Sequence, residues 1–255
     1  MASIPLFQTT PSALPAPAPV AAPEREDLAR LRAALGEHSR QLRSGREVLR
    51  DAGRQVRSAV ATGLRPLDRL LGGGFPKGRL IELTGTRSSG RYSIVLSSLA
   101  SITRCGEPAA LVDHGAHFDP QVAKEAGIDL ERLLWVAPSS VKGSVAAAEM
   151  LLATGFPLVI IDLGMRLRGR RVPDAAWIRL ARAAQAYGAA LLLSAPFSLT
   201  PMAAAGIIRA ERARPRWNHA GPPLLDGLSL SMVIEKWRHD REGKRTETPL
   251  RISSS

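Results

Sequence analysis

Five short apolar runs alternate with longer mixed segments between residues 79 and 194. The runs are Arg79–Thr84, Ala109–Asp113, Leu133–Val136, Leu158–Asp162 and Ala190–Ser194, and each predicts a buried strand. The segments between them predict helices at Arg91–Thr103, Asp119–Ala126, Ser144–Thr154 and Asp174–Tyr187. Apolar strands that alternate with helices are typical of a mostly parallel sheet covered on both faces. The pattern therefore predicts an α/β fold.

The flanking segments divide the chain into three parts. Residues 1–23 are rich in proline and alanine and predict a disordered arm. Residues 24–58 carry leucines at helical spacing, which fits a helix packed on its own domain as well as one docked on a partner. Residues 59–255 predict the core, which opens with a short helix from Pro66 to Leu71. The core ends in a β-hairpin of Leu228–Arg238 with Thr246–Ile252.

The charge of the chain indicates what kind of partner it binds, and its cysteine content indicates the cellular compartment. The chain has 35 Lys and Arg against 23 Asp and Glu, a formal net charge of +12, which favours nucleic acid or an acidic protein surface. The single cysteine, Cys105, rules out an intrachain disulfide framework and fits a reducing, cytoplasmic compartment. We expect neither a signal peptide nor a membrane-spanning helix, because no apolar run is long enough. We also expect no metal site.

A phosphate-binding loop is predicted between the first strand and the helix that follows it. The segment Gly85-Thr-Arg-Ser88-Ser89-Gly90-Arg91-Tyr92 has both glycines of the pattern G-x-x-x-x-G-K-[ST]. Backbone N–H groups of such a loop curl around phosphate oxygens at a helix N-terminus. Arg91 replaces the lysine that reaches the β- and γ-phosphates, and Tyr92 replaces the hydroxyl residue that holds Mg²⁺. Ser93 is one candidate to supply that hydroxyl instead.

Residues 60–195 resemble the core of RecA-like recombinases. The resemblance rests on TGLRPLDRLLGGGFPKGRLIELTGTRSSGRY, on LVDHGAHFDPQVAKEAGIDLERLLWVAPSS and on LATGFPLVIIDLG, whose mutual spacing also matches. It implies a RecA-like core, with a mostly parallel sheet flanked by helices. It also implies that Asp162 corresponds to the acidic residue that positions Mg²⁺.

The sequence departs from that family at the groups that perform hydrolysis. The position of the glutamate that activates the attacking water is Gly115, and glycine cannot orient a proton. Ala195 and Pro196 lie where the family has an Asn-Gln pair that senses the γ-phosphate. Together with Arg91 and Tyr92, these changes predict a protein that does not hydrolyse ATP. We expect no cofactor, although the two glycines and Asp162 leave residual binding of ATP or ADP open.

Two basic segments match the DNA-facing loops of RecA-like proteins. The first contains Arg166, Arg168, Arg170 and Arg171, and the second, residues 197–226, contains Arg209, Arg212, Arg214, Arg216 and Trp217. Closely spaced arginines neutralise phosphates without sequence preference, and a tryptophan stacks on bases. We therefore expect contact with single-stranded DNA, with an acidic partner protein as the alternative.

A degraded phosphate loop, a proline-rich arm and a basic C-terminal part resemble the ImuA type of recombinase-related protein. The resemblance implies an accessory role in SOS-type translesion mutagenesis. It also implies assembly with a Y-family polymerase-like protein, an error-prone C-family polymerase or RecA. One alternative is a divergent DNA-dependent ATPase or recombinase that uses Glu82, Asp113, Asp119 or Asp162. Another is a cell-division or RecA-filament regulator that binds only protein.

Overall fold

The structure, a computed structural model, describes residues 59–165, 172–218, 224–237 and 242–251. The predicted arm at 1–23, the helical segment at 24–58 and the arginines at 166–171 lie outside the described residues. In the described part of the chain, no helix is long and apolar enough to cross a membrane.

The described elements form one large sheet, one small sheet and helices on both faces of the large sheet. The strands are β1 (Ala59–Val60), β2 (Phe75–Pro76), β3 (Arg79–Thr84), β4 (Ala109–Asp113), β5 (Leu133–Val136), β6 (Leu158–Asp162), β7 (Ala190–Ala195), β8 (Gly206–Ala210), β9 (Arg214–Asn218), β10 (Leu224–Trp237) and β11 (Arg245–Arg251). The helices are α3 (Arg65–Leu71), α4 (Arg91–Arg104), α5 (Pro120–Glu125), α6 (Val141–Ala153), α7 (Asp174–Tyr187) and the 3₁₀ turn η2 (Leu130–Arg132).

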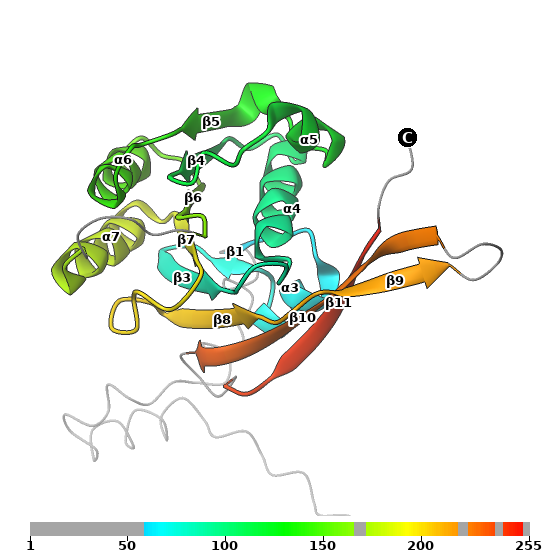
Figure 1. The fold of residues 1–255 in the computed structure, drawn as a ribbon. Coiled ribbons are helices and arrows are strands. Elements are labelled where there is room, and N and C mark those ends of the chain that lie inside the picture. The colour runs from blue at the N-terminus through cyan, green and yellow to red at the C-terminus, as the bar shows by residue number, and fades with distance from the viewer. Residues whose placement is uncertain (1–58, 166–171, 219–223, 238–241, 252–255) are drawn as a thin grey trace, which may run out of the picture. The chain divides into compact units, whose positions relative to one another are not determined.

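The large sheet has the order β11-β10-β8-β3-β7-β6-β4-β5, with β9 paired to β10. Strands β8, β3, β7, β6, β4 and β5 are parallel, whereas β9, β10 and β11 are antiparallel to their neighbours. Helices α3, α4 and α5 cover one face and α6 and α7 the other (Figure 1). This arrangement confirms the predicted α/β fold with a mostly parallel sheet.

The strands follow the apolar runs, because four of the five runs are buried along nearly their whole length. The fifth run forms β5 at the edge of the sheet, where Leu134 and Trp135 are exposed. Strands β3, β4, β5 and β6 have the predicted bounds, and β7 continues one residue further, to Ala195. Helix α6 begins three residues earlier than predicted, because the Ser140 hydroxyl caps it by accepting from the N–H of Gly143 at 3.0 Å. The predicted pairing of Leu228–Arg238 with Thr246–Ile252 is found as β10 with β11.

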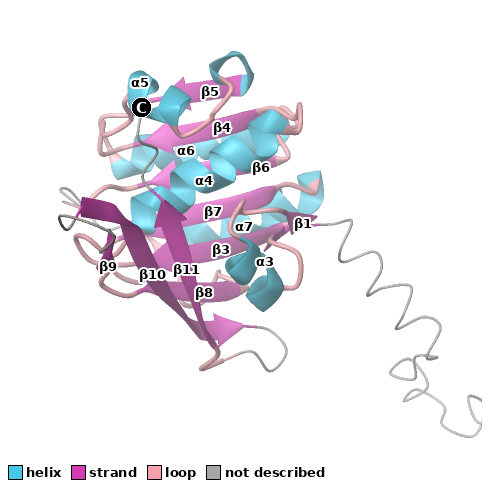
Figure 2. Ribbon diagram, turned by 90° about the vertical axis from the view of Figure 1, so that its right-hand side faces the viewer, coloured by secondary structure: helices cyan, strands magenta, loops and turns pink. Residues whose placement is uncertain are grey.

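The prediction of one long loop over residues 197–226 is wrong. The connection after β7 is short, and the same stretch contains β8 and β9. Strand β8 adds parallel to β3, and β9 adds antiparallel to the first half of β10, as Figure 2 shows. Arg209 therefore lies on a sheet strand, and Arg214, Arg216 and Trp217 lie on another.

The C-terminal strands pack directly on the loop that precedes α4. Leu230 of β10 is fully buried, and its side chain lies where a β-carbon on Gly90 would be, 2.1 Å from that position. The N–H of Ala213 also donates to the carbonyl oxygen of Ser88 at 2.9 Å. The antiparallel strands therefore help to fix the loop's conformation.

We expect Leu230→Ala to lower the free energy of unfolding by about 2–5 kcal/mol, because it removes a fully buried side chain and leaves a cavity. Denaturant unfolding checks this value. Leu225→Ala, at an exposed position on the same strand, is the matched control and should change the free energy by less than about 1 kcal/mol. Equal effects of the two substitutions would contradict the packing role.

Candidate phosphate-loop site

The loop between β3 and α4 needs both of its glycines for reasons of packing. Gly90 has a φ of 80°, in the left-handed region that favours glycine, and it faces Leu230. A β-carbon on Gly85 would come within 2.5 Å of the Ser89 hydroxyl oxygen. Ser89 is itself buried, and its hydroxyl accepts from the N–H of Arg91 at 3.4 Å. The two glycines are thus explained without a bound phosphate.

Arg91 is the first residue of α4, and its side chain turns inward over the ends of β6 and β7. Its Nη1 donates to Asp162 Oδ1 at 2.8 Å and also to the Ser194 hydroxyl. Its Nη2 donates to the carbonyl oxygen of Gly164 at 2.8 Å and contacts Met165 Sδ. The Arg91 guanidinium therefore binds a neighbouring carboxylate.

Asp162 has its charge neutralised inside the protein. Its side chain is 2% exposed and that of Arg91 is 5% exposed. The Ser194 hydroxyl donates to the same Oδ1 atom at 2.7 Å, because Asp162 and Ser194 are direct partners on adjacent strands. The carboxylate that the sequence predicts as a Mg²⁺ ligand is thus held by a cation of the chain itself.

Tyr92 packs on the core that lies under α4. Burial raises the pKa of its hydroxyl, and the carboxylates of Asp113 and Asp162 raise it further. Within the described residues the hydroxyl has no hydrogen-bond partner. Tyr92 therefore stays a neutral phenol and serves as a packing group.

The space beside Gly115, where the sequence predicts the loss of a catalytic glutamate, is filled by His117. A β-carbon on Gly115 would lie 2.8 Å from His117 Cδ2 and 3.1 Å from Gly164 Cα. The imidazole of His117 therefore occupies the space into which a longer side chain at 115 would extend. His114 lies nearby, where its Nδ1 is 3.2 Å from the carbonyl oxygen of Pro138.

A cavity of about 540 Å³ remains beside the loop. Its walls come from the loop residues Thr86–Ser93 and from five other residues, namely His117, Asp162, Met165, Ala213 and Leu228. Ser93, the candidate replacement hydroxyl, lies in this lining. The cavity has the size of a small-ligand site, but its one carboxylate is already paired with Arg91. No cluster of three or more metal-ligating side chains exists among the described residues.

The other acidic residues considered for catalysis have structural partners. Glu82 is fully buried and accepts from the Ser198 hydroxyl at 2.8 Å and from the N–H groups of Leu199 and Thr200. Asp119 caps α5 by accepting from Gln121 and Val122. Asp113 Oδ2 accepts from the N–H of Phe118, while its Oδ1 has no partner in the described part of the chain.

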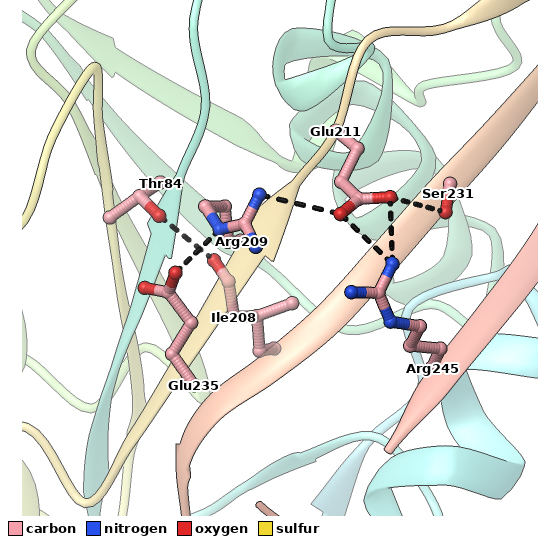
Figure 3. Close-up of polar contacts among 7 residues, drawn as sticks. All are labelled: Thr84, Ile208, Arg209, Glu211, Ser231, Glu235 and Arg245. Carbon is pink, nitrogen blue, oxygen red and sulfur yellow. Dashed lines mark hydrogen bonds and ion pairs between the residues drawn. The ribbon is translucent and has the colours of Figure 1, made fainter. Parts of the chain in front are cut away.

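The predicted DNA-contacting arginines differ in their electrostatic surroundings. Arg209 pairs with Glu235 and with Glu211 at 3.4 Å, and Glu211 also pairs with Arg245 at 3.2 Å, as Figure 3 shows. Arg216 lies 3.9 Å from Asp226. Arg212 and Arg214 are exposed and have no ion-pair partner among the described residues. The structure thus separates residues that the sequence placed in one group.

The sequence reasoning missed Ser194 and the role of His117. Ser194 becomes recognisable once β6 and β7 are known to be adjacent, because it then lies beside Asp162. The space-filling role of His117 depends on the turn after β4 and has no signal in the spacing of residues. The carboxylates of Glu211 and Glu235 were missed for a similar reason, since their pairing follows from strand register.

Comparison with known proteins identifies the family of this fold and loop. The family RecA N-terminal domain matches residues 30–171, more than half of the chain. The chain belongs to the RecA family. Its relatives include the RecA protein of Tropheryma whipplei, 36% identical over 135 residues, and that of Mycobacteroides abscessus, 37% identical over 144 residues. These matches cover 52% and 55% of the chain, but only 31% and 41% of those relatives.

A solved structure supports the same fold for this RecA-family chain. The RadB recombinase superimposes with a TM-score of 0.55 and 22% sequence identity, over 74% of the chain and 94% of RadB. The chain therefore shares the recombinase fold. Its matches span 31–41% of the length of these two RecA proteins.

We expect Arg91→Ala to lower the free energy of unfolding by about 3–5 kcal/mol, because it leaves the buried Asp162 carboxylate unpaired. The double variant R91A/D162A should cost less than the sum of R91A and D162A. Denaturant unfolding of all four proteins gives this coupling energy. Strictly additive effects would show that the two side chains do not depend on each other.

Proposed function

We propose that this chain is a RecA-family DNA-repair protein that binds DNA and partner proteins without hydrolysing ATP. The observation that carries the proposal is the buried contact of Arg91 with Asp162 and Ser194. In a hydrolysing enzyme of this type the corresponding positions contribute charge to Mg²⁺ and the transferred phosphoryl group. Here the charges of Arg91 and Asp162 neutralise each other inside the protein.

A second line of support comes from the groups around the attacking water. Gly115 offers no proton acceptor, and His117 fills the adjacent space. Glu82, Asp119 and Asp162 are engaged in hydrogen bonds that hold loops, a helix and Arg91. A divergent ATPase would need at least one positioned carboxylate free for chemistry. Of the four candidate carboxylates, only that of Asp113 has a buried oxygen without a hydrogen-bond partner among the described residues.

We assign the protein to translesion mutagenesis of the ImuA type, as an accessory protein in the cytoplasm. It would bridge single-stranded DNA with a Y-family polymerase-like protein, an error-prone C-family polymerase or RecA. The net charge of +12 supports a polyanionic ligand. A RecA-like fold that does not hydrolyse ATP fits a protein that holds its partners together, rather than one that is driven by ATP hydrolysis. A regulator that binds only protein is the competing role, and DNA binding distinguishes the two.

An ATPase assay tests the catalytic part of the proposal. The purified full chain, given Mg-ATP and single-stranded DNA, should hydrolyse ATP no faster than its Asp162→Asn variant. The variant R91K/Y92T restores the two consensus loop residues, and it should also stay inactive because position 115 still lacks a glutamate. DNA-stimulated hydrolysis by the natural chain that is lost in Asp162→Asn, while the thermal midpoint shows the variant to be folded, would overturn the proposal.

A genetic experiment tests the cellular role. Deleting the gene should lower the frequency of damage-induced mutations and leave homologous recombination unchanged. Complementation with the natural sequence and with Asp162→Asn should both restore mutagenesis, provided that the variant accumulates to the same level. Loss of recombination, or failure of Asp162→Asn despite normal levels, would support the ATP-dependent recombinase instead.

A further inference from the structure

The connection between β7 and β8 has the place of a DNA-facing loop but not its charge. Residues 196–205, Pro-Phe-Ser-Leu-Thr-Pro-Met-Ala-Ala-Ala, contain no lysine or arginine. The buried Glu82 carboxylate holds one end, and the Lys236 ammonium holds the other by donating to the carbonyl oxygens of Ala204, at 2.9 Å, and Pro201. A fixed loop without cations cannot neutralise a phosphate backbone.

The sheet surface next to this loop is electrically balanced. Two arginines, Arg209 and Arg245, share two glutamates, Glu211 and Glu235 (Figure 3). Hydrogen bonding from Ser231, with the nearby Arg245 and Arg209, lowers the pKa of Glu211, so this carboxylate stays charged. A polyanion that approached Arg209 would therefore also meet two carboxylates, and the cluster is a poor DNA site.

Strand β9 has the opposite character. Arg212, just before it, and Arg214, at its start, are exposed and without an ion-pair partner in the described residues. Trp217 is 50% exposed, and Leu225, its direct cross-strand partner on β10, is 43% exposed. Within the part of the chain that the structure describes, β9 pairs only with β10, and the two strands extend beyond the helices in Figure 1. The open edge therefore combines free cations with an apolar aromatic surface.

We infer that single-stranded DNA binds along the open edge of β9. Its phosphates contact Arg212 and Arg214, and one base stacks on Trp217 beside Leu225. Side chains of a strand alternate between its two faces, so a ligand that runs along the edge reaches both Arg214 and Trp217. Arginine with an exposed aromatic ring is the combination that holds single strands without sequence preference. This inference rests on the proposed function, since it locates the DNA contact of that function.

Fluorescence anisotropy with a labelled oligothymidylate and the full chain tests the inference. Arg212→Ser with Arg214→Ser should weaken binding about tenfold and lower the slope of log affinity against log salt by about 1.4, or ~0.7 per lost phosphate contact. The control R65S/R182S removes the same charge at exposed positions on α3 and α7, and it should keep the natural slope. Equal slopes in the two double variants would overturn the inference.

Trp217 gives a second, independent measurement. Trp217→Ala should weaken binding about tenfold at every salt concentration, and Trp217→Phe should restore most of the affinity because phenylalanine also stacks. Trp135→Ala, at a similarly exposed tryptophan on β5, should bind as the natural chain does. An unchanged thermal midpoint shows that each variant is folded.

The remaining outcomes separate the DNA site from the proposed function. A natural chain that binds no oligothymidylate, or that binds polyglutamate equally well with no effect of Trp217→Ala, overturns the β9 site and favours an acidic protein partner. The ATPase result is independent of either outcome. If the chain hydrolyses ATP and its β9 variants lose DNA binding, the DNA site on β9 is supported and the proposed non-hydrolysing function is overturned.

Discussion

The contact between Arg91 and Asp162 is the interaction on which the centre of this structure depends. Burying one carboxylate without a partner costs several kcal/mol, and Arg91 removes that cost with a single side chain. In doing so it joins the start of α4 to the ends of β6 and β7. The Asp162 carboxylate is therefore neutralised by a side chain of the protein itself.

The C-terminal part of the chain also holds the loop that precedes α4. Leu230 presses on Gly90, and the N–H of Ala213 holds the Ser88 carbonyl. The loop is therefore fixed from inside by Arg91 and from outside by the strands β9 and β10 that carry the exposed Trp217 and Leu225. The loop that carries Arg91 and the strand that carries Trp217 are thus linked through β10, which contacts both.

The sequence predicted the central fold well because burial there is uniform along each strand. Runs such as Leu158–Asp162 face helices on both sides and therefore read as unbroken apolar segments. Strand β8 was missed because it is short and Arg209 interrupts its buried apolar run. Strand β9 was missed because arginine and proline make up most of it. The sequence identified the two glycines of the loop. It did not predict that Gly90 packs against Leu230, because Leu230 lies far away in the sequence. Arg209 looked like a DNA ligand until strand register placed Glu235 beside it.

The loop that is fixed by Arg91 and Leu230 has a consequence for timing. In a recombinase that hydrolyses ATP, each hydrolysis event limits how long one bound state lasts. We propose that this chain does not hydrolyse ATP, so that no hydrolysis step limits the lifetime of its bound state. On the proposed function, the lifetime of its complexes is then set by ordinary dissociation. The amount assembled on damaged DNA follows the concentration of the protein, so control passes to synthesis and degradation.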